Sequence, residues 1–485
     1  MLYNSYIFVF VFLPLAIISY ILVFKFLGAK ATQLLLISLS LVFYGYWELS
    51  YLWIISCSVV TNFFLSKLII SSKILGNATL KLLFLGVLLN LFILGYFKYT
   101  DFLILNINTL SSSDFNLLNL ALPLAISFFT IQQIAFLVDC HYGIIKNIKL
   151  IDYSLFILFF PQLIAGPIVR YRESFDYYLA SNLKQISQEN LICGLSIFGF
   201  GLFKKVVIAD SFMEISNFGY QVSDSLSYLN TLIYSTSYSL QMYFDFSGYS
   251  DMAFGLAIIF GIKIPYNFLS PYRATSIVDY WKRWHISLTS FITNYIYNPI
   301  LFHFRRMDLT TTSIITVFAF TVSGVWHGAN WNYILWGIMH GLGVSINHIW
   351  KKHGIKINRY LSWLITMYFI NLTFVVFRNT NFDVISISLQ KLLLINTEKP
   401  VIPINYDALI FSNEIISIIS KLFGGLGALS FLYFLSCIFI VSNLNTKQVY
   451  EFYKFNYKQT FFYLTLFVLG VFSISKQVEF LYFVF

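Results

Sequence analysis

The chain has 485 residues, of which 58% are hydrophobic and 11% are charged. Soluble domains carry about 25% charged residues, so this composition excludes a soluble enzyme and indicates an integral membrane protein. The formal net charge of +10 points to membrane lipids and cytoplasmic loops, and no nucleic-acid partner is expected. The four cysteines lie in apolar stretches without paired spacing, so neither a disulfide framework nor a metal site is expected.

Apolar runs separated by lysines predict how the first part of the chain crosses the membrane. The run at 6–26 has no basic residue before it and no small-residue cleavage site after it, which favours a retained helix over a signal peptide. Further spans are expected near 31–47, 51–70, 82–97 and 117–138, with an outer loop at 98–116. Lysines recur at alternate ends of these spans, so the N-terminus is predicted to lie outside the cytoplasm.

Residues 160–170 interrupt this regular pattern. They read FPQLIAGPIVR and place two prolines and a glycine in an apolar setting. Non-helical backbone at membrane depth is tolerated only where it is buried in protein or lines a cavity, so a re-entrant or broken helix is expected here. An ordinary helix kinked by proline is the alternative.

Two carboxylates lie in the apolar region 190–262, where two or three further spans are expected. Asp245 and Asp251 stand six residues apart, and such groups face the protein interior or water rather than lipid. Pairing with nearby arginines is the favoured interpretation, and a catalytic role is the alternative. Residues 280–288 follow and read YWKRWHISL, in which cations flanked by tryptophans predict a helix at the membrane interface.

A histidine within residues 322–341 is the strongest functional signal. The stretch reads VSGVWHGANWNYILWGIMHG, two apolar arms joined by a polar, glycine-rich turn that contains His327. An ionisable side chain in a membrane region is costly to desolvate and by default indicates a functional site. The alternative is a structural histidine that is hydrogen-bonded between two helices.

The remainder of the chain is expected to add a span near 360–377, a long loop at 379–422, and spans near 424–442 and 461–475. Residues 476–485 then form an extracytoplasmic tail rich in aromatic side chains, which either has a chemical role or anchors the chain end at the membrane interface. No internal repeat divides the chain. Residues 1–485 are therefore predicted to form a single domain of an all-α polytopic integral membrane protein.

The YWKRWHISL and VWHGANWNYILWGIMHG stretches and the order of the spans around them resemble the membrane-bound O-acyltransferase family. Within it, they resemble the bacterial branch that O-acetylates alginate and peptidoglycan or transfers D-alanine to teichoic acid. The resemblance covers about 162–378. It implies a ring of tilted helices with re-entrant segments around a thin centre, where a cytoplasmic acyl donor and an outer acceptor approach one point. It also implies the bacterial inner membrane, with both termini extracytoplasmic on the predicted topology.

The resemblance assigns roles to individual residues. The catalytic histidine of the family falls on His327, and its second characteristic position, a histidine or asparagine, falls on His285. Residues 480–485 read FLYFVF and are similar to an aromatic motif whose tyrosine, here Tyr482, carries the acyl group. The other candidates for the donor site or its tunnel are Gln162, Trp281, Arg283, Trp326, Asn330, Trp331, Asp245 and Asp251.

The implied function is that of a membrane O-acetyltransferase subunit. It would take an acetyl group from a cytoplasmic thioester, acetyl-CoA, as a substrate, with no bound cofactor, and pass it across the membrane towards peptidoglycan or an alginate-like polysaccharide. His327 would act as general base for Tyr482, because a tyrosine hydroxyl with a pKa near 10 is a weak nucleophile at neutral pH. A separate extracytoplasmic polysaccharide O-acetyltransferase is the expected partner.

Three alternatives stay open. One is a lipid or protein acyltransferase of the same family, although the long outer tail and the resemblance to the bacterial branch argue against it. D-alanyl transfer to teichoic acid is implied by the same resemblance, although that branch is usually shorter and lacks a fused tail. A polytopic transporter would also contain broken helices and buried carboxylates, but the sequence shows no repeated halves with paired interruptions.

Overall fold

A computed structural model describes residues 1–75, 79–164, 166–304, 308–395, 416, 427–451 and 457–474. The regular elements in these ranges are helices, and six of them are long and apolar enough to cross a membrane. The prediction of an all-α polytopic membrane protein is therefore confirmed. The chain divides into two compact units, Met1–Leu195 with Met252–Pro265 and Ser196–Asp251 with Tyr266–Phe485. The single domain expected for residues 1–485 stays a prediction.

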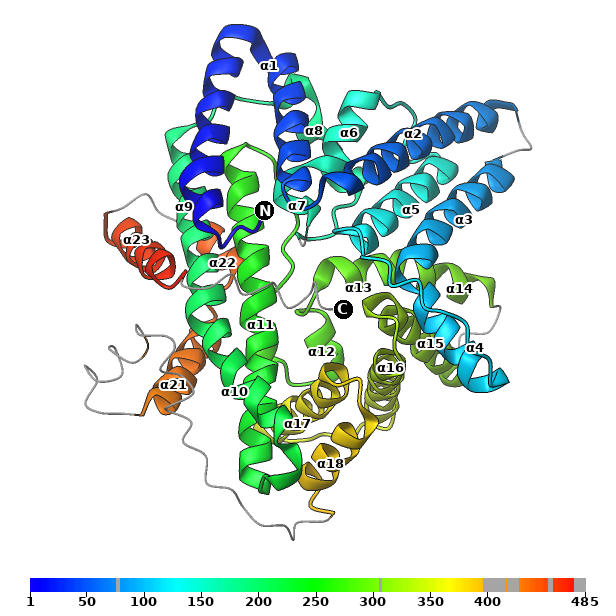
Figure 1. The fold of residues 1–485 in the computed structure, drawn as a ribbon, viewed down its shortest axis with the longest axis vertical. Helices are drawn as coiled ribbons and strands as arrows, with labels where there is room; N and C mark the ends of the chain where they lie inside the picture. Colours follow the sequence, from blue (N-terminus) through cyan, green and yellow to red (C-terminus); the bar gives the residue numbers. More distant parts are fainter. Residues whose placement is uncertain are drawn as a thin grey trace. The chain divides into compact units, whose positions relative to one another are not determined.

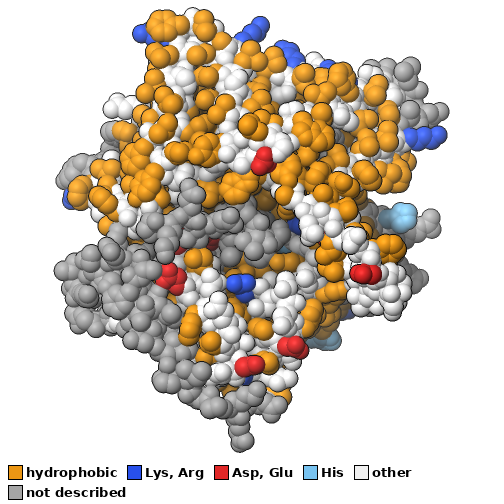
Figure 2. All heavy atoms as spheres, in the orientation of Figure 1, with side chains coloured by type: hydrophobic (Ala, Val, Ile, Leu, Met, Phe, Trp, Pro, Cys, Tyr) orange, Lys and Arg blue, Asp and Glu red, His pale blue; other side chains and the backbone are white. Residues whose placement is uncertain are grey.

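The first unit begins with a helical hairpin rather than one straight helix. The π-helical turn Phe8–Phe12 leads into α1, Leu13–Gly45, which turns back at Gly28 with a φ of 79° that suits glycine. Figure 1 shows the two arms running in opposite directions, and the ring centres of Phe8 and Phe43 lie 5.8 Å apart. The spans expected at 6–26 and 31–47 are these two arms. Figure 2 shows hydrophobic side chains over much of the visible face of this unit, as a lipid-facing surface requires.

Three longer helices and one short helix continue the first unit. These are α2 at Leu52–Leu75, α3 at Thr79–Lys98, α4 at Thr100–Ser111 and α5 at Ile126–Tyr142. The expected outer loop at 98–116 is wrong for its first part, because α4 fills it. The Asp101 carboxylate on α4 accepts the backbone N–H groups of Leu118 and Asn119, which holds the following chain in a non-helical path. The span expected at 117–138 consequently starts only at Ile126.

The segment with two prolines is a broken helix, as expected. Helix α6, Leu150–Leu158, is followed by the four-residue α7, Phe160–Leu163. Residues 164 and 166–170 are not helical, and α8 follows at Tyr171–Tyr178. A single kinked helix, the alternative, is therefore wrong. The Gln162 side chain supports the break, because it donates to the Phe156 carbonyl and accepts from the Tyr178 hydroxyl at 2.6 Å.

The second unit contains the motifs singled out from the sequence. Its long helices are α9 at Gln188–Phe203, which begins in the first unit, α11 at Tyr228–Ile259, which ends in the first unit, α15 at Leu309–His327, α16 at Trp331–Lys352 and α17 at Arg359–Arg378. Its shorter elements include the π-helices Lys204–Ala209 and Thr293–Tyr297, and α10 at Asp210–Gln221, α12 at Ile277–Trp281, α13 at Ile286–Ile292, α14 at Asn298–His303, α18 at Phe382–Leu392, α21 at Ala428–Val441, α22 at Thr446–Glu451 and α23 at Tyr457–Phe472.

The predictions for this unit have different outcomes. The interface helix predicted at 280–288 is wrong, because the chain breaks between α12 and α13 and reverses at His285, whose φ is 43°. The expected span at 360–377 coincides with α17, and the short helix α18 lies within the segment 379–422 that was expected to be a loop. The aromatic tail at 476–485 lies outside the described residues.

Helices α15 and α16 form a tight antiparallel pair, which Figure 1 shows side by side. Glycines permit this approach: a side chain at Gly324 would meet the Tyr333 carbonyl, and one at Gly337 would meet the Phe320 carbonyl. At Gly341 a Cβ would lie 2.6 Å from the Cα of Val317. The functional histidine candidate is thus placed at the end of a rigid pair of helices.

We expect Gly337→Ala to lower the free energy of unfolding by about 1–3 kcal/mol, because the added methyl group forces two close-packed backbones apart. Thermal unfolding in detergent, followed by tryptophan fluorescence, measures this change. Gly95→Ala is the matched control, since a Cβ at that position meets no atom within 4 Å. Equal stability of the two variants would contradict the close packing of α15 on α16.

Candidate functional site

His327 is the last residue of α15, and the chain turns over Gly328, Ala329 and Asn330 before α16 begins. The turn is shorter than the expected polar stretch, because both helices extend into it. The His327 side chain is buried, and its ring centre lies 5.1 Å from the rings of Trp326 and Trp336. The imidazole therefore sits in an aromatic enclosure in which an ionic interaction is weakly screened by water.

His285 lies close to His327 although the two residues are distant in sequence. It occupies the left-handed turn before α13, is almost fully buried, and its ring centre is 6.4 Å from that of His327. The Phe246 ring of α11 packs edge-on against it at 4.8 Å. The structure thus brings together the two histidines that the sequence singled out.

The His285 ring is held by a polar group that sequence reasoning missed. Its Nδ1 lies 3.2 Å from Oδ1 of Asn267, and both side chains are buried. His285 lies outside the six candidate spans, and burial lowers the pKa of its imidazole to about 3, so the ring is neutral at pH 7. The sequence did contain a signal for Asn267, because it is a polar residue within the apolar run at 264–269.

Two tryptophans link the histidine pair to a third buried histidine. The indole Nε1 of Trp281 donates to Nδ1 of His340 at 3.2 Å, and the Trp281 ring lies 5.9 Å from that of Trp336. Trp336 in turn contacts His327, so the three aromatic rings form one contact series. The sequence analysis selected neither His340 nor Trp336 as a site residue.

The remaining sequence candidates have different environments. Trp326 is buried against the histidine pair, whereas Trp331 at the start of α16 is exposed. Asn330 lies in the turn beside His327 and makes no side-chain cap to α16. Arg283 donates from Nε to the Asp279 carboxylate at 2.9 Å within its own segment. Gln162 belongs to the first unit, whereas Tyr482 lies outside the described residues.

Asp245 and Asp251 form buried ion pairs, but their partners are lysines rather than the expected arginines. Lys205 contacts Asp245 at 2.6 Å and Asp210 at 2.7 Å, and Lys204 contacts Asp251 at 2.7 Å. The Thr446 hydroxyl also donates to Asp251. These contacts connect the π-helix Lys204–Ala209 to α11, and α11 to α22, and they pair both carboxylates with cations, which favours the structural interpretation over the catalytic one.

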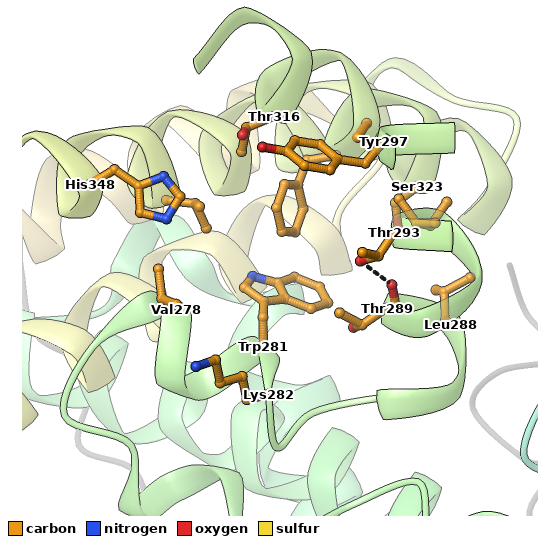
Figure 3. Close-up of a pocket in the computed structure, with 14 residues that line it drawn as sticks. Val278, Trp281, Lys282, Leu288, Thr289, Thr293, Tyr297, Thr316, Ser323 and His348 are labelled. Atoms are coloured by element: carbon orange, nitrogen blue, oxygen red, sulfur yellow. Dashed lines mark hydrogen bonds between the residues drawn. The ribbon is translucent and has the colours of Figure 1, made fainter. Parts of the chain in front are cut away.

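A cavity of about 270 Å³ lies beside the Trp281 indole. In Figure 3 this indole lies on one side of the cavity and the side chains of Tyr297 and Thr316 lie on the other. Ser323 also lines it, and Ser323 precedes His327 by one turn of α15. Within the described ranges, no three His, Cys, Asp or Glu side chains are grouped as a metal site would require.

The chain matches the family model of the membrane-bound O-acyltransferases over residues 41–387. It belongs to that family and is a multi-pass membrane O-acyltransferase. It is 40% identical over 414 residues to a peptidoglycan O-acetyltransferase of Helicobacter pylori, covering 79% of this chain and 78% of the relative. It is 33% identical over 390 residues to a probable alginate O-acetylase of Azotobacter vinelandii, covering 79% and 76%.

A more distant similarity extends to another transfer reaction. The chain is 28% identical over 245 residues to a teichoic acid D-alanyltransferase of Streptococcus thermophilus, covering 49% of this chain and 59% of the relative. Membership in the family removes the transporter alternative. The relatives differ in the group they transfer, acetyl in one case and D-alanyl in the other.

Proposed function

We propose that this protein takes an acetyl group from acetyl-CoA at the cytoplasmic face and passes it across the bacterial inner membrane. The acetyl group then serves O-acetylation of a cell-envelope polysaccharide, peptidoglycan or an alginate-like polymer. The observation that carries this proposal is the buried pair of His285 and His327, 6.4 Å apart, in a chain similar over most of its length to polysaccharide O-acetyltransferases. Both termini are placed outside the cytoplasm in this proposal.

The reaction begins with a hydroxyl group, which we assign to Tyr482 of the tail. Its oxygen attacks the thioester carbonyl, a C–O bond forms, and the C–S bond breaks. His327 takes the hydroxyl proton and returns it to the departing thiolate, which leaves as the thiol of CoA. The acetyl-tyrosine then supplies an extracytoplasmic transferase, the proposed partner, which acetylates the polymer.

The arrangement of the site supports this chemistry in two ways. The buried aromatic walls around His327 exclude water, which limits hydrolysis of the thioester and strengthens hydrogen bonds to developing charge. The cavity beside Trp281 and Ser323 offers an apolar space one helical turn from His327, of a kind that suits the acyl end of the donor.

The donor is tested with the purified full-length protein in nanodiscs. Acetyl-CoA and a D-alanyl thioester are supplied separately, and release of the free thiol is measured in the presence of a polysaccharide acceptor system. Thiol release from acetyl-CoA alone supports the proposal. Release only from the D-alanyl thioester would overturn it in favour of D-alanyl transfer, and release from neither would exclude both donors.

The proposed role of Tyr482 as acyl carrier gives a second prediction. After incubation with labelled acetyl-CoA and denaturation, mass spectrometry of the C-terminal peptide is expected to find one acetyl group on Tyr482. Tyr482→Phe removes the nucleophile and abolishes the label, whereas Tyr450→Phe, a tyrosine outside the tail, retains it. Thiol release by Tyr482→Phe at the wild-type rate would show direct transfer to the acceptor and exclude the tail as carrier.

A further inference from the structure

Several hydrogen bonds converge on the Asn267 side chain. Its Oδ1 accepts the backbone N–H of Ser287 at 3.3 Å and the Ser287 hydroxyl at 2.8 Å, and the same oxygen lies 3.2 Å from Nδ1 of His285. Its Nδ2 donates to the Ser250 hydroxyl of α11 at 3.4 Å. One buried amide therefore ties the His285 turn to α13 and α11.

The hydrogen-bond pattern fixes which atom of the amide faces the histidine. A backbone N–H can only donate, so the Asn267 atom that faces the Ser287 N–H is the oxygen. That oxygen can only accept, so a hydrogen bond between it and His285 at 3.2 Å requires the proton on Nδ1. The Ser287 hydroxyl lies 3.5 Å from the same nitrogen, but it donates to the Asn267 oxygen at the shorter distance of 2.8 Å. In a neutral imidazole with hydrogen on Nδ1, the other nitrogen, Nε2, has the lone pair.

The backbone holds Asn267 in this position independently of its side chain. The Asn267 carbonyl accepts the N–H of Ile286 at 3.0 Å, and the Arg283 carbonyl accepts the N–H of Leu269 at 2.9 Å. These two bonds join residues 267–269 to residues 283–286. The Phe268 ring covers the same face, lying 6.5 Å from the His285 ring and nearly parallel to it. The amide and the imidazole are thus held by the same pair of segments.

We propose that Asn267 is a positioning residue that keeps the proton of His285 on Nδ1, so that Nε2 takes part in acyl transfer as a hydrogen-bond acceptor. A hydroxyl group placed between the His285 and His327 rings can then be oriented by a hydrogen bond to Nε2 of His285 before His327 takes its proton. His285 does not donate to the thioester carbonyl in this arrangement, because that would require hydrogen on Nε2. The kinetic part of this inference rests on the proposed acetyl transfer, and the position of the proton does not.

Most of the charged groups on the segments around His285 are paired with each other. His327 lies on α15, and the carboxylates of α11, Asp245 and Asp251, are paired with Lys205 and Lys204. Arg283, two residues before the histidine, is paired with Asp279. The loop at 266–270 contributes no charged side chain. A carboxylate in place of the Asn267 amide would therefore be a new charge directly beside Nδ1.

The first test locates the proton without reference to activity. The full-length protein labelled with ¹⁵N-histidine is reconstituted in nanodiscs, and the ring nitrogen resonances are recorded, with His285→Gln identifying the His285 signals among seven histidines. We expect Nδ1 to be protonated and Nε2 to be unprotonated in the wild type. Asn267→Ala is expected to give a mixture of the two tautomers. Hydrogen on Nε2 in the wild type would overturn the proposal.

The second test uses the pH dependence of thiol release from acetyl-CoA. In Asn267→Asp the carboxylate favours the imidazolium, so the loss of activity on the acid side is expected to move to higher pH by about 1–3 units. Asn267→Ala is expected to lower kcat about 10- to 100-fold without a matching change in KM. The acid limb of the pH profile is the range in which activity falls at low pH. If this limb lies at the same pH in Asn267→Asp and in the wild type, the proposal is contradicted.

Asn371→Asp is the matched control, because Asn371 on α17 is also buried and donates to the Ser235 hydroxyl at 2.9 Å. It introduces the same chemical change into the same unit and is expected to leave the acid limb in place. If acetyl-CoA is not the donor, the kinetic test gives no rate in any variant, whereas the ¹⁵N spectra still report the tautomer. Failure of the proposed function is thereby distinguished from failure of this inference.

Discussion

His327→Gln is expected to lower the rate of thiol release from acetyl-CoA by about 10²- to 10⁴-fold, the usual contribution of a positioned general base. Glutamine retains hydrogen-bonding capacity and approximate length but cannot take up a proton at neutral pH. The residue is buried between Trp326 and Trp336, so water has little access as a replacement base. Initial rates at saturating donor, measured from pH 6 to pH 9, give the size of the effect.

The control for this variant is His303→Gln, because His303 at the end of α14 is exposed and lies outside the histidine pair. It is expected to retain the wild-type rate within about twofold. Both variants should elute as the same species and unfold at similar temperatures. A His327→Gln protein that is folded and transfers acetyl groups at the wild-type rate would remove His327 from the reaction and leave His285 as the remaining base.

The largest effect on stability is expected from breaking the buried pair of Lys204 and Asp251. Their side chains are 3% and 1% exposed, so Lys204→Met leaves a carboxylate buried without its cation. The expected loss is about 3–5 kcal/mol in the free energy of unfolding. Denaturant unfolding in nanodiscs, followed by tryptophan fluorescence, measures it. The double variant Lys204→Met with Asp251→Leu should recover much of the loss, since it removes both charges.

The exposed pair of Lys447 and Glu451 provides the comparison. Its atoms are 3.9 Å apart and each side chain is 46% exposed, so Lys447→Met is expected to change the free energy of unfolding by about 0–1 kcal/mol. If Lys204→Met were as mild as Lys447→Met, the Asp251 carboxylate would have to be neutral in the folded protein. The double variant would then be no more stable than the single one.

Much of the fold could be predicted from apolar periodicity, and each wrong prediction has a local cause. The spans at 31–47 and 360–377 were predictable because each is a long apolar run with a charged residue at either end. Helix α4 was missed because a 12-residue segment is too short to register as a span. The break at 282–285 was missed because cations beside tryptophans suit an interface helix, whereas the left-handed φ at His285 depends on tertiary contacts with 267–269.

The candidate site was predictable only in part, because its geometry also depends on tertiary packing. His327 stands out because a histidine in an apolar stretch is rare, and resemblance added His285. Their proximity depends on how α13 and α15 pack, which no local pattern encodes. Asn267 and Trp336 gave weak signals, since asparagine and tryptophan occur widely in membrane proteins without chemical roles.

The two consecutive lysines of the π-helix Lys204–Ala209 also have a consequence for biogenesis. The apolar segment Gln188–Gln221 is 34 residues long, and Lys204 and Lys205 stand at its middle. Each lysine at the centre of a membrane helix opposes insertion by about 2.5–3.5 kcal/mol, as does each aspartate. The segment is therefore expected to leave the translocon together with α11, whose Asp245 and Asp251 neutralise both charges, so that the two helices enter the bilayer as one hairpin.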